Sequence, residues 1–358
     1  MSQHQTGKKS KLQSYLDSRP DLKYKYTKIR DKASNIIISG YDITKRCNLR
    51  CEGCFFFEGE LSTKYEEIKN IEEYKLFFAD EVKRGITYPH FAGAEPGLVQ
   101  DRLLVANQFW DRGLIYTNGT FKFDPAITFM KHISVWGNFE TDEYLRGAPV
   151  FKKALQNAQG DNKSIFMYTI NKKNIDNINE VVKICKDHGV KISFNHYSPS
   201  RQYENKIELN EKTQEYSTFR LSTKDDNLML TQDDLKKIRD ILEERIDQDP
   251  ETVIYSKHYN EYVNSGKTLW NIDEATGIAK DCVILNKPYH RQHHTDFSYD
   301  DSECCIANTD CRECRHYVSV YTKLMDSIRP ALKSLESFES WLDIYYTWCK
   351  LHFVDWES

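Results

Sequence analysis

Several features are missing from this chain of 358 residues. No apolar run approaches the roughly 20 residues that span a bilayer, and the first residues, MSQHQTGKKSKLQSYL, contain no hydrophobic signal segment. Repeats and low-complexity tracts are absent as well. Charge of one sign is not in excess, since 50 Lys and Arg face 54 Asp and Glu for a formal net charge of -4. We therefore expect a cytoplasmic protein without a membrane or nucleic-acid partner.

Cysteine is plentiful, and eight of the ten cysteines fall in two tight groups, which favours metal binding over disulfides in an intracellular protein. The first group is Cys47, Cys51 and Cys54, spaced C-x3-C-x2-C in DITKRCNLRCEGCFFF. Thiolates at this spacing on a short loop converge on one small face, as an iron-sulfur cubane requires. A zinc site is the alternative, but no fourth Cys or His lies nearby on the loop.

Three ligands leave one corner of a 4Fe-4S cube open, and this arrangement resembles the radical S-adenosylmethionine (SAM) superfamily. The resemblance implies that the open iron chelates SAM, and that reductive cleavage yields a 5'-deoxyadenosyl radical. It also implies an electron donor such as flavodoxin or ferredoxin. Cys47, Cys51 and Cys54 are then the catalytic cluster ligands.

The middle of the chain alternates short apolar runs with amphipathic segments, a pattern typical of βα units around a parallel sheet. The predicted strands are residues 36–43, 88–92, 114–117, 133–136, 165–170 and 191–197. Tyr65, Ile68, Ile71, Tyr74, Phe78 and Val82 recur at near-helical spacing, as do Ile175, Ile178, Val182 and Cys185. Six units with cysteines after the first strand resemble the partial (β/α)6 barrel of radical SAM enzymes, in which the chemistry lies at the carboxyl ends of the strands.

The expected fold class is α/β, with this barrel followed by a small cysteine-rich domain and C-terminal helices. The predicted divisions are a basic extension, 1–34, the barrel, 35–200, a connecting helical segment, 201–270, and an auxiliary domain with helices, 271–358. The extension holds nine Lys and Arg against three Asp, as a solvated tail or surface helix does. Residues 201–234 are predicted to be a long connection, and Thr231 with Asp234 predicts a helix cap.

HFAGAEPGL, after the second predicted strand, resembles the glycine-glycine-glutamate-proline segment of the family. Glycine lets the backbone approach a ligand, and a carboxylate can receive the ammonium group of the methionine moiety. The resemblance assigns these jobs to Gly93 and Glu95, while Ala94 departs from the usual second glycine.

Further segments resemble the SAM pocket of the family. Asn118 in YTNGT follows the third strand, Ser134 in HISVWGNFE is expected at the ribose, and Arg146 is expected to pair with the SAM carboxylate. Phe55, with its two aromatic neighbours, is a candidate for the adenine-facing surface, although three consecutive aromatics also suit a core.

The second cysteine group comprises Cys282, Cys304, Cys305, Cys311 and Cys314. Its spacing resembles the twitch domain, a shortened SPASM domain, and implies one auxiliary 4Fe-4S cluster. Sequence does not choose between the adjacent Cys304 and Cys305, and zinc suits the same four-thiolate site. His290, His293 and His294 lie between the ligands, and a surface cluster is favoured for them over a substrate or metal role.

The predicted activity is hydrogen abstraction from a C–H bond of a small polar metabolite or natural-product precursor, giving oxidation, epimerisation or bond formation. The short N-terminal extension favours this interpretation, because many peptide-modifying relatives carry a winged-helix domain there. A peptide maturase, acting as epimerase or cross-linking enzyme, is the alternative, and a non-catalytic iron-sulfur protein is the third hypothesis. The C-terminal module and the final helical stretch, residues 318–353, are expected to form a lid over the barrel mouth.

Overall fold

A parallel sheet organises the computed structural model, which describes residues 10–210, 221–287, 290–299, 304, 309–354 and 356. Within that part of the chain the sheet has seven strands in the order β6-β5-β4-β3-β2-β1-β7. The strands are β1 Ile38–Asp42, β2 Tyr88–Ala92, β3 Leu114–Thr117, β4 Met130–Val135, β5 Ser164–Ile170, β6 Lys191–His196 and β7 Gln292–His293. All neighbours are parallel, so their carboxyl ends share one edge.

The six predicted strands are present, and the α/β partial barrel is confirmed. The boundary of β4 was wrong, because the strand begins at Met130 rather than Ile133. The polar residues there do not end the strand, since the buried Lys131 ammonium lies 2.9 Å from the Asp161 carboxylate. The prediction missed β7, a strand of only two residues that pairs with β1.

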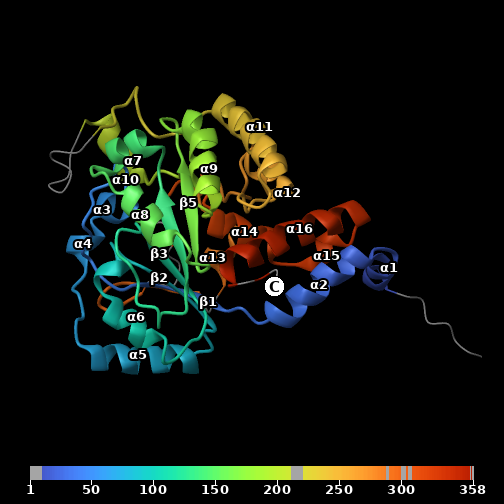
Figure 1. The fold of residues 1–358 in the computed structure, drawn as a ribbon, viewed down its shortest axis with the longest axis horizontal. Helices are drawn as coiled ribbons and strands as arrows, with labels where there is room; N and C mark the ends of the chain where they lie inside the picture. The colour runs from blue at the N-terminus through green and yellow to red at the C-terminus, as the bar shows by residue number, and fades with distance from the viewer. Residues whose placement is uncertain are drawn as a thin grey trace, which may run out of the picture.

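Helices follow most of the strands and cover the sheet (Figure 1). They are α3 Phe55–Glu58, α4 Leu61–Lys64, α5 Ile71–Lys83, α6 Gln100–Ala106, α7 Phe139–Arg146, α8 Phe151–Ala158, α9 Ile178–Asp187 and α10 Arg201–Glu208, with 3-10 turns η1 Pro96–Leu98 and η2 Ile175–Asn177. The predicted helical stripe from Tyr65 was too long, because Asn70 caps α5 and Val82 is 41% exposed. α10 occupies part of the segment that was predicted to be a connection.

The segment after the sheet forms α11 Gln232–Gln248 and α12 Lys257–Val263. Thr231 and Asp234 make the predicted capping box. Leu235, Ile238 and Leu242 are buried, and α11 packs against α9 and α12.

Two segments far apart in sequence lie side by side, the N-terminal helices α1 Lys11–Ser18 and α2 Pro20–Lys32 and the C-terminal helices (Figure 1). The latter are α13 Val283–Asn286, α14 Tyr317–Met325, α15 Ile328–Ala331 and α16 Leu335–His352. Tyr15 stacks on Phe338 at 5.9 Å, and Leu22 and Ile29 are buried. The described part of the basic extension is therefore packed helix, not a solvated tail. None of the helices in the searched residues has the length and apolarity for a membrane crossing.

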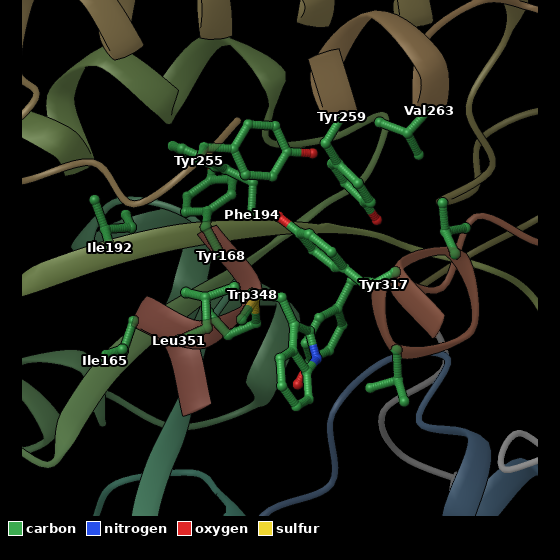
Figure 2. Packing of buried hydrophobic residues seen from close by; sticks show 14 of the residues in the cluster. Ile165, Tyr168, Ile192, Phe194, Tyr255, Tyr259, Val263, Tyr317, Trp348 and Leu351 are labelled. Carbon is green, nitrogen blue, oxygen red and sulfur yellow. The ribbon is translucent and has the colours of Figure 1, made fainter. Parts of the chain in front are cut away.

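The last helix, α16, packs against the strands rather than over the barrel mouth. Figure 2 shows Trp348 and Leu351 of α16 and Tyr317 of α14 in one buried cluster with Ile165 of β5. The Tyr88 hydroxyl, at the start of β2, donates to the His352 carbonyl at 2.5 Å. Since β2 begins there, α16 closes the amino-terminal end of the barrel. The expectation of a lid is wrong for α16, whose aromatic face packs into the core instead.

Candidate active site

A cavity of about 270 Å³ lies at the carboxyl ends of the strands. It draws on the loops after β1, β2 and β3, on β4 to β6 and on the C-terminal segment. The residues that the sequence singles out for the first cluster and for SAM all line it: Cys47, Cys51, Cys54, Phe55, Gly93, Ala94, Glu95, Asn118, Ser134 and Arg146.

The three cysteines of the first group converge on the loop between β1 and α3. Each interacts electrostatically with the other two, and burial raises the pKa of the Cys47 thiol to about 11 and that of Cys54 to about 12. Donors face the sulfurs, including the Leu49 amide at 3.4 Å from Cys47 Sγ and the Arg146 side chain at Cys51. A buried, donor-lined set of soft ligands fits an iron-sulfur cluster, whose binding would displace the thiol protons.

Gly93 has a φ of +109°, and a Cβ there would lie 2.6 Å from the Thr44 carbonyl oxygen. Ala94 N donates to the same oxygen at 2.8 Å. The glycine is thus required by the packing of two strand-end loops, a reason that the sequence prediction, which invoked approach to a ligand, did not contain.

Glu95 is buried, and its carboxylate ties the loops after β2 and β3 together. Oε1 accepts from Gly97 N at 2.7 Å and from the Thr117 hydroxyl at 2.6 Å, while Oε2 accepts from Asn118 N at 2.7 Å. A carboxylate has about four acceptor positions, so these bonds leave room for one more donor. Burial raises the pKa of Glu95, opposed by these hydrogen bonds.

Arg146 is a second buried connector. Its Nη1 donates to the Ser134 carbonyl at 2.7 Å and to Asp142 Oδ2 at 3.3 Å, and its Nη2 donates to the Asn118 carbonyl at 3.4 Å. Its buried Nε has no hydrogen-bond partner within the described residues, so a donor remains for a ligand in the cavity.

Asn118 links the third strand to the cysteine loop. Its Nδ2 donates to Asn48 Oδ1 at 2.8 Å and lies 3.8 Å from Cys47 Sγ. Among the three aromatics, Phe55 is 39% exposed, whereas Phe56 and Phe57 are buried in a small cluster with Leu61. Phe56 and Phe57 therefore belong to the core, and Phe55 remains the candidate for the adenine-facing surface.

The second cysteine group is also brought together. Cys282, Cys304, Cys311 and Cys314 interact electrostatically in every pairwise combination. Burial raises the pKa of Cys282 to about 11 and that of Cys314 well above its usual value. Backbone amides face the thiols, as suits an iron-sulfur cluster. Cys305 lies outside the described residues.

The prediction of a surface histidine cluster was wrong. β7 carries these residues onto the edge of the sheet, where His293 stacks on Tyr41 at 5.3 Å and His294 is buried. His290 and His294 line the cavity together with Cys304. The second cysteine group therefore borders the same cavity as the first.

The floor of the cavity was missed by sequence reasoning. It contains His90 on β2, Tyr116 on β3, His132 on β4, His196 on β6 and Tyr317 on α14. Buried parallel strands are usually near-continuous apolar runs, so the histidines that interrupt β2 and β4 were the available signal.

In the described residues, no group of three or more His, Cys, Asp or Glu side chains is close enough to hold a single metal ion. No family model matches the chain. Over 178 residues, 44% of the chain, it is 29% identical to Fe-coproporphyrin III synthase of Methanosarcina barkeri, and the match spans 43% of that relative.

Two solved structures share the fold. The chain resembles Streptococcus suis SuiB bound to its precursor peptide SuiA, with a TM-score of 0.52, 11% identity and coverage of 88% of this chain and 71% of that one. SuiB alone gives a TM-score of 0.51 at 12% identity, covering 84% and 67%. The place of the cysteine motif after β1 and the partial barrel agree with the predicted resemblance to the radical SAM superfamily.

Proposed function

We propose that this protein is a radical SAM enzyme that cleaves SAM reductively and abstracts hydrogen from a C–H bond of a small polar metabolite or natural-product precursor. The observation that supports the proposal is the convergence of ten predicted residues from separate segments on one cavity. A protein that merely stores a cluster has no need of a glutamate and an arginine with spare capacity beside it.

In this proposal Cys47, Cys51 and Cys54 hold the first cluster. When bound, the cluster and SAM supply a 5'-deoxyadenosyl radical for hydrogen abstraction. The remaining acceptor position of Glu95 suits an ammonium group, and Arg146 Nε suits a carboxylate. The radical must be kept from water, and the packed floor of the barrel serves that purpose.

The second cysteine group is proposed to hold an auxiliary 4Fe-4S cluster through Cys282, Cys304, Cys311 and Cys314. Because Cys304 borders the cavity, this site is well placed to exchange an electron with a bound substrate. Zinc in the same four-thiolate site remains the competing assignment. Metal analysis of protein isolated without added metal distinguishes the two, since zinc would exclude an electron-transfer role.

A peptide substrate is the second candidate. The fold likeness to SuiB, solved with a precursor peptide, favours it. A ribosomal precursor would place one side chain in the cavity and the rest of the peptide outside it.

The direct test is an oxygen-free reaction of the reconstituted protein with SAM and a low-potential reductant such as dithionite. We expect 5'-deoxyadenosine and methionine in equal amounts. Cys185→Ala is the matched control, because Cys185 is a fully buried core thiol on α9 outside both groups, and it should retain cleavage. Absence of 5'-deoxyadenosine from protein with a full complement of iron and sulfide would contradict the proposal.

A further inference from the structure

Residues 195–200, the last two of β6 and the four that follow, contact the chain next to both cysteine groups. Pro199 restricts the preceding Ser198 to extended backbone conformations, which stiffens this short segment. Tyr197 and Ser198 both border the cavity, and each is only 8% exposed. The segment is thus placed to hold parts of the molecule that are far apart in the sequence.

Tyr197 makes the contact with the first group. Its hydroxyl donates to the Gly53 carbonyl at 3.0 Å, and Gly53 directly precedes Cys54. Gly53 has a φ of +61°, and a Cβ there would collide with the Tyr197 hydroxyl. The tyrosine ring is itself held by edge-on contacts with Trp136 at 5.9 Å and Tyr203 at 5.7 Å. The cysteine loop and Tyr197 are therefore fitted to each other at Gly53.

Ser198 and Ser200 make the contacts with the second group. Ser198 Oγ accepts from Arg315 N at 3.0 Å, and Arg315 directly follows the last cysteine of the group. Ser200 pairs with Thr309 in an isolated antiparallel bridge. The C-x2-C pair of the second group lies in sequence between these two contacts, so both of its flanks are tied to the segment.

A third contact fixes the helix that follows the second group. Asn195 Oδ1 accepts from Tyr317 N at 3.1 Å. Tyr317 is the first residue of α14, and the preceding His316 gives that helix no side-chain cap. The first amides of a helix have no acceptor within it, so Asn195 satisfies one of them from β6.

We propose that residues 195–200 are a shared support that holds both cysteine groups beside the cavity. Tyr197 is the positioning residue of the first group, and Ser198 is that of the second. Because the two groups are tied to adjacent residues, this segment sets their separation, on which the electron exchange proposed for the second group depends. The inference rests on the proposed function in taking metal clusters to be what the groups hold.

The test removes the two neighbouring hydroxyls one at a time. The anaerobically reconstituted full chain is treated with EDTA and iodoacetamide, and mass spectrometry follows the alkylation of Cys54 and Cys314 as metal leaves each group. We expect Tyr197→Phe to speed the labelling of Cys54 by roughly three- to tenfold, as the loss of one hydrogen bond allows, and to leave that of Cys314 unchanged. Ser198→Ala should do the reverse.

Two further variants serve as controls. Ser198→Thr keeps a hydroxyl at the same position, so the labelling of Cys314 should match that of the unmodified protein. Tyr168→Phe removes a buried hydroxyl that donates to the Asn174 carbonyl, away from both groups, and should change the labelling of neither.

The crossed pattern separates positioning from an ordinary loss of stability, which would speed the labelling of both groups in either variant. That result overturns the proposal, as does an effect on the opposite group or an unchanged rate in one or both variants. The measurement works with iron or zinc in the second group and needs no SAM cleavage. A failure of the proposed function, seen as missing 5'-deoxyadenosine, is therefore distinguishable from a failure of this inference.

Discussion

The two cysteine groups border one cavity but differ in how many ligands they offer. The first provides three thiols on one loop, whereas the second provides four described thiols from separate parts of the C-terminal segment. Three ligands leave a corner of a cubane for an exchangeable partner, and four close the coordination sphere. In the proposed function, ligand number therefore separates reactivity from electron storage within one chain.

Removing the first group should have the largest effect. Replacing Cys47, Cys51 and Cys54 with alanine should abolish 5'-deoxyadenosine formation, because no cluster remains to bind SAM. Iron and sulfide should fall by about one cluster and persist at the second group. Continued SAM cleavage by the triple variant would show that the two groups have been assigned the wrong roles.

Removing Cys311 and Cys314 should separate the two activities. We expect the loss of about one cluster and a stronger block of product formation than of SAM cleavage, because the first cluster is intact. Iron, sulfide and zinc analysis, together with the ratio of product to 5'-deoxyadenosine, checks this. An unchanged ratio of product to 5'-deoxyadenosine would mean that the second group takes no part in turnover.

The surroundings of the two groups also differ: β7, which lies between Cys282 and Cys304 in the sequence, contacts a carboxylate of α5. His293 Nε2 of β7 lies 3.4 Å from Glu81 on α5. Burial alone would raise the pKa of Glu81, but hydrogen bonds from His293, Arg84 and Tyr41 outweigh it and lower the pKa to about 2. Folding therefore favours the ionised carboxylate, which contributes stability above the unfolded pKa and loses it as the pH falls toward 2.

Glu81→Gln should consequently lower the free energy of unfolding at pH 7 by roughly 2 kcal/mol and flatten its decline in acid. Urea denaturation at several pH values measures both. Glu72→Gln, on the exposed face of the same helix, is the control and should leave the acid profile as it is. If the free energy of unfolding of Glu81→Gln falls with pH as steeply as that of the unmodified protein, this role is contradicted.

The first group depends instead on backbone packing. Gly93→Ala should cost about 1–3 kcal/mol of stability, because its Cβ would meet the Thr44 carbonyl in a strained conformation. Gly85→Ala isolates the steric part, since Gly85 also has a positive φ but open space around it. If denaturation shows that both variants lose the same stability, the contact with the Thr44 carbonyl does not explain the effect.

Sequence predicted the features that local pattern determines. β2 and β3 were placed residue for residue, and the Thr231 cap was found, because apolar runs and capping chemistry are local. The cysteine motif and the segment around Glu95 were found for the same reason, since their spacing is short. Their convergence on one cavity follows from the parallel sheet.

What sequence missed depends on contacts between distant segments. β7 has two residues and exists through its pairing with β1, so no periodicity could reveal it. The buried His132 of β4 is held by the Tyr317 hydroxyl of α14 and the Leu351 carbonyl of α16, two segments far away in the sequence. α16 itself was assigned to the wrong end of the barrel, because an aromatic helix suits a lid and a core equally.

The central claim is that the first cysteine group holds a cluster with one open iron that binds SAM. Electron paramagnetic resonance of the reduced, reconstituted Cys311→Ala/Cys314→Ala variant, recorded with and without SAM, tests it with the second site removed. We predict that SAM changes the spectrum of the remaining cluster. An identical spectrum with and without SAM would contradict the account.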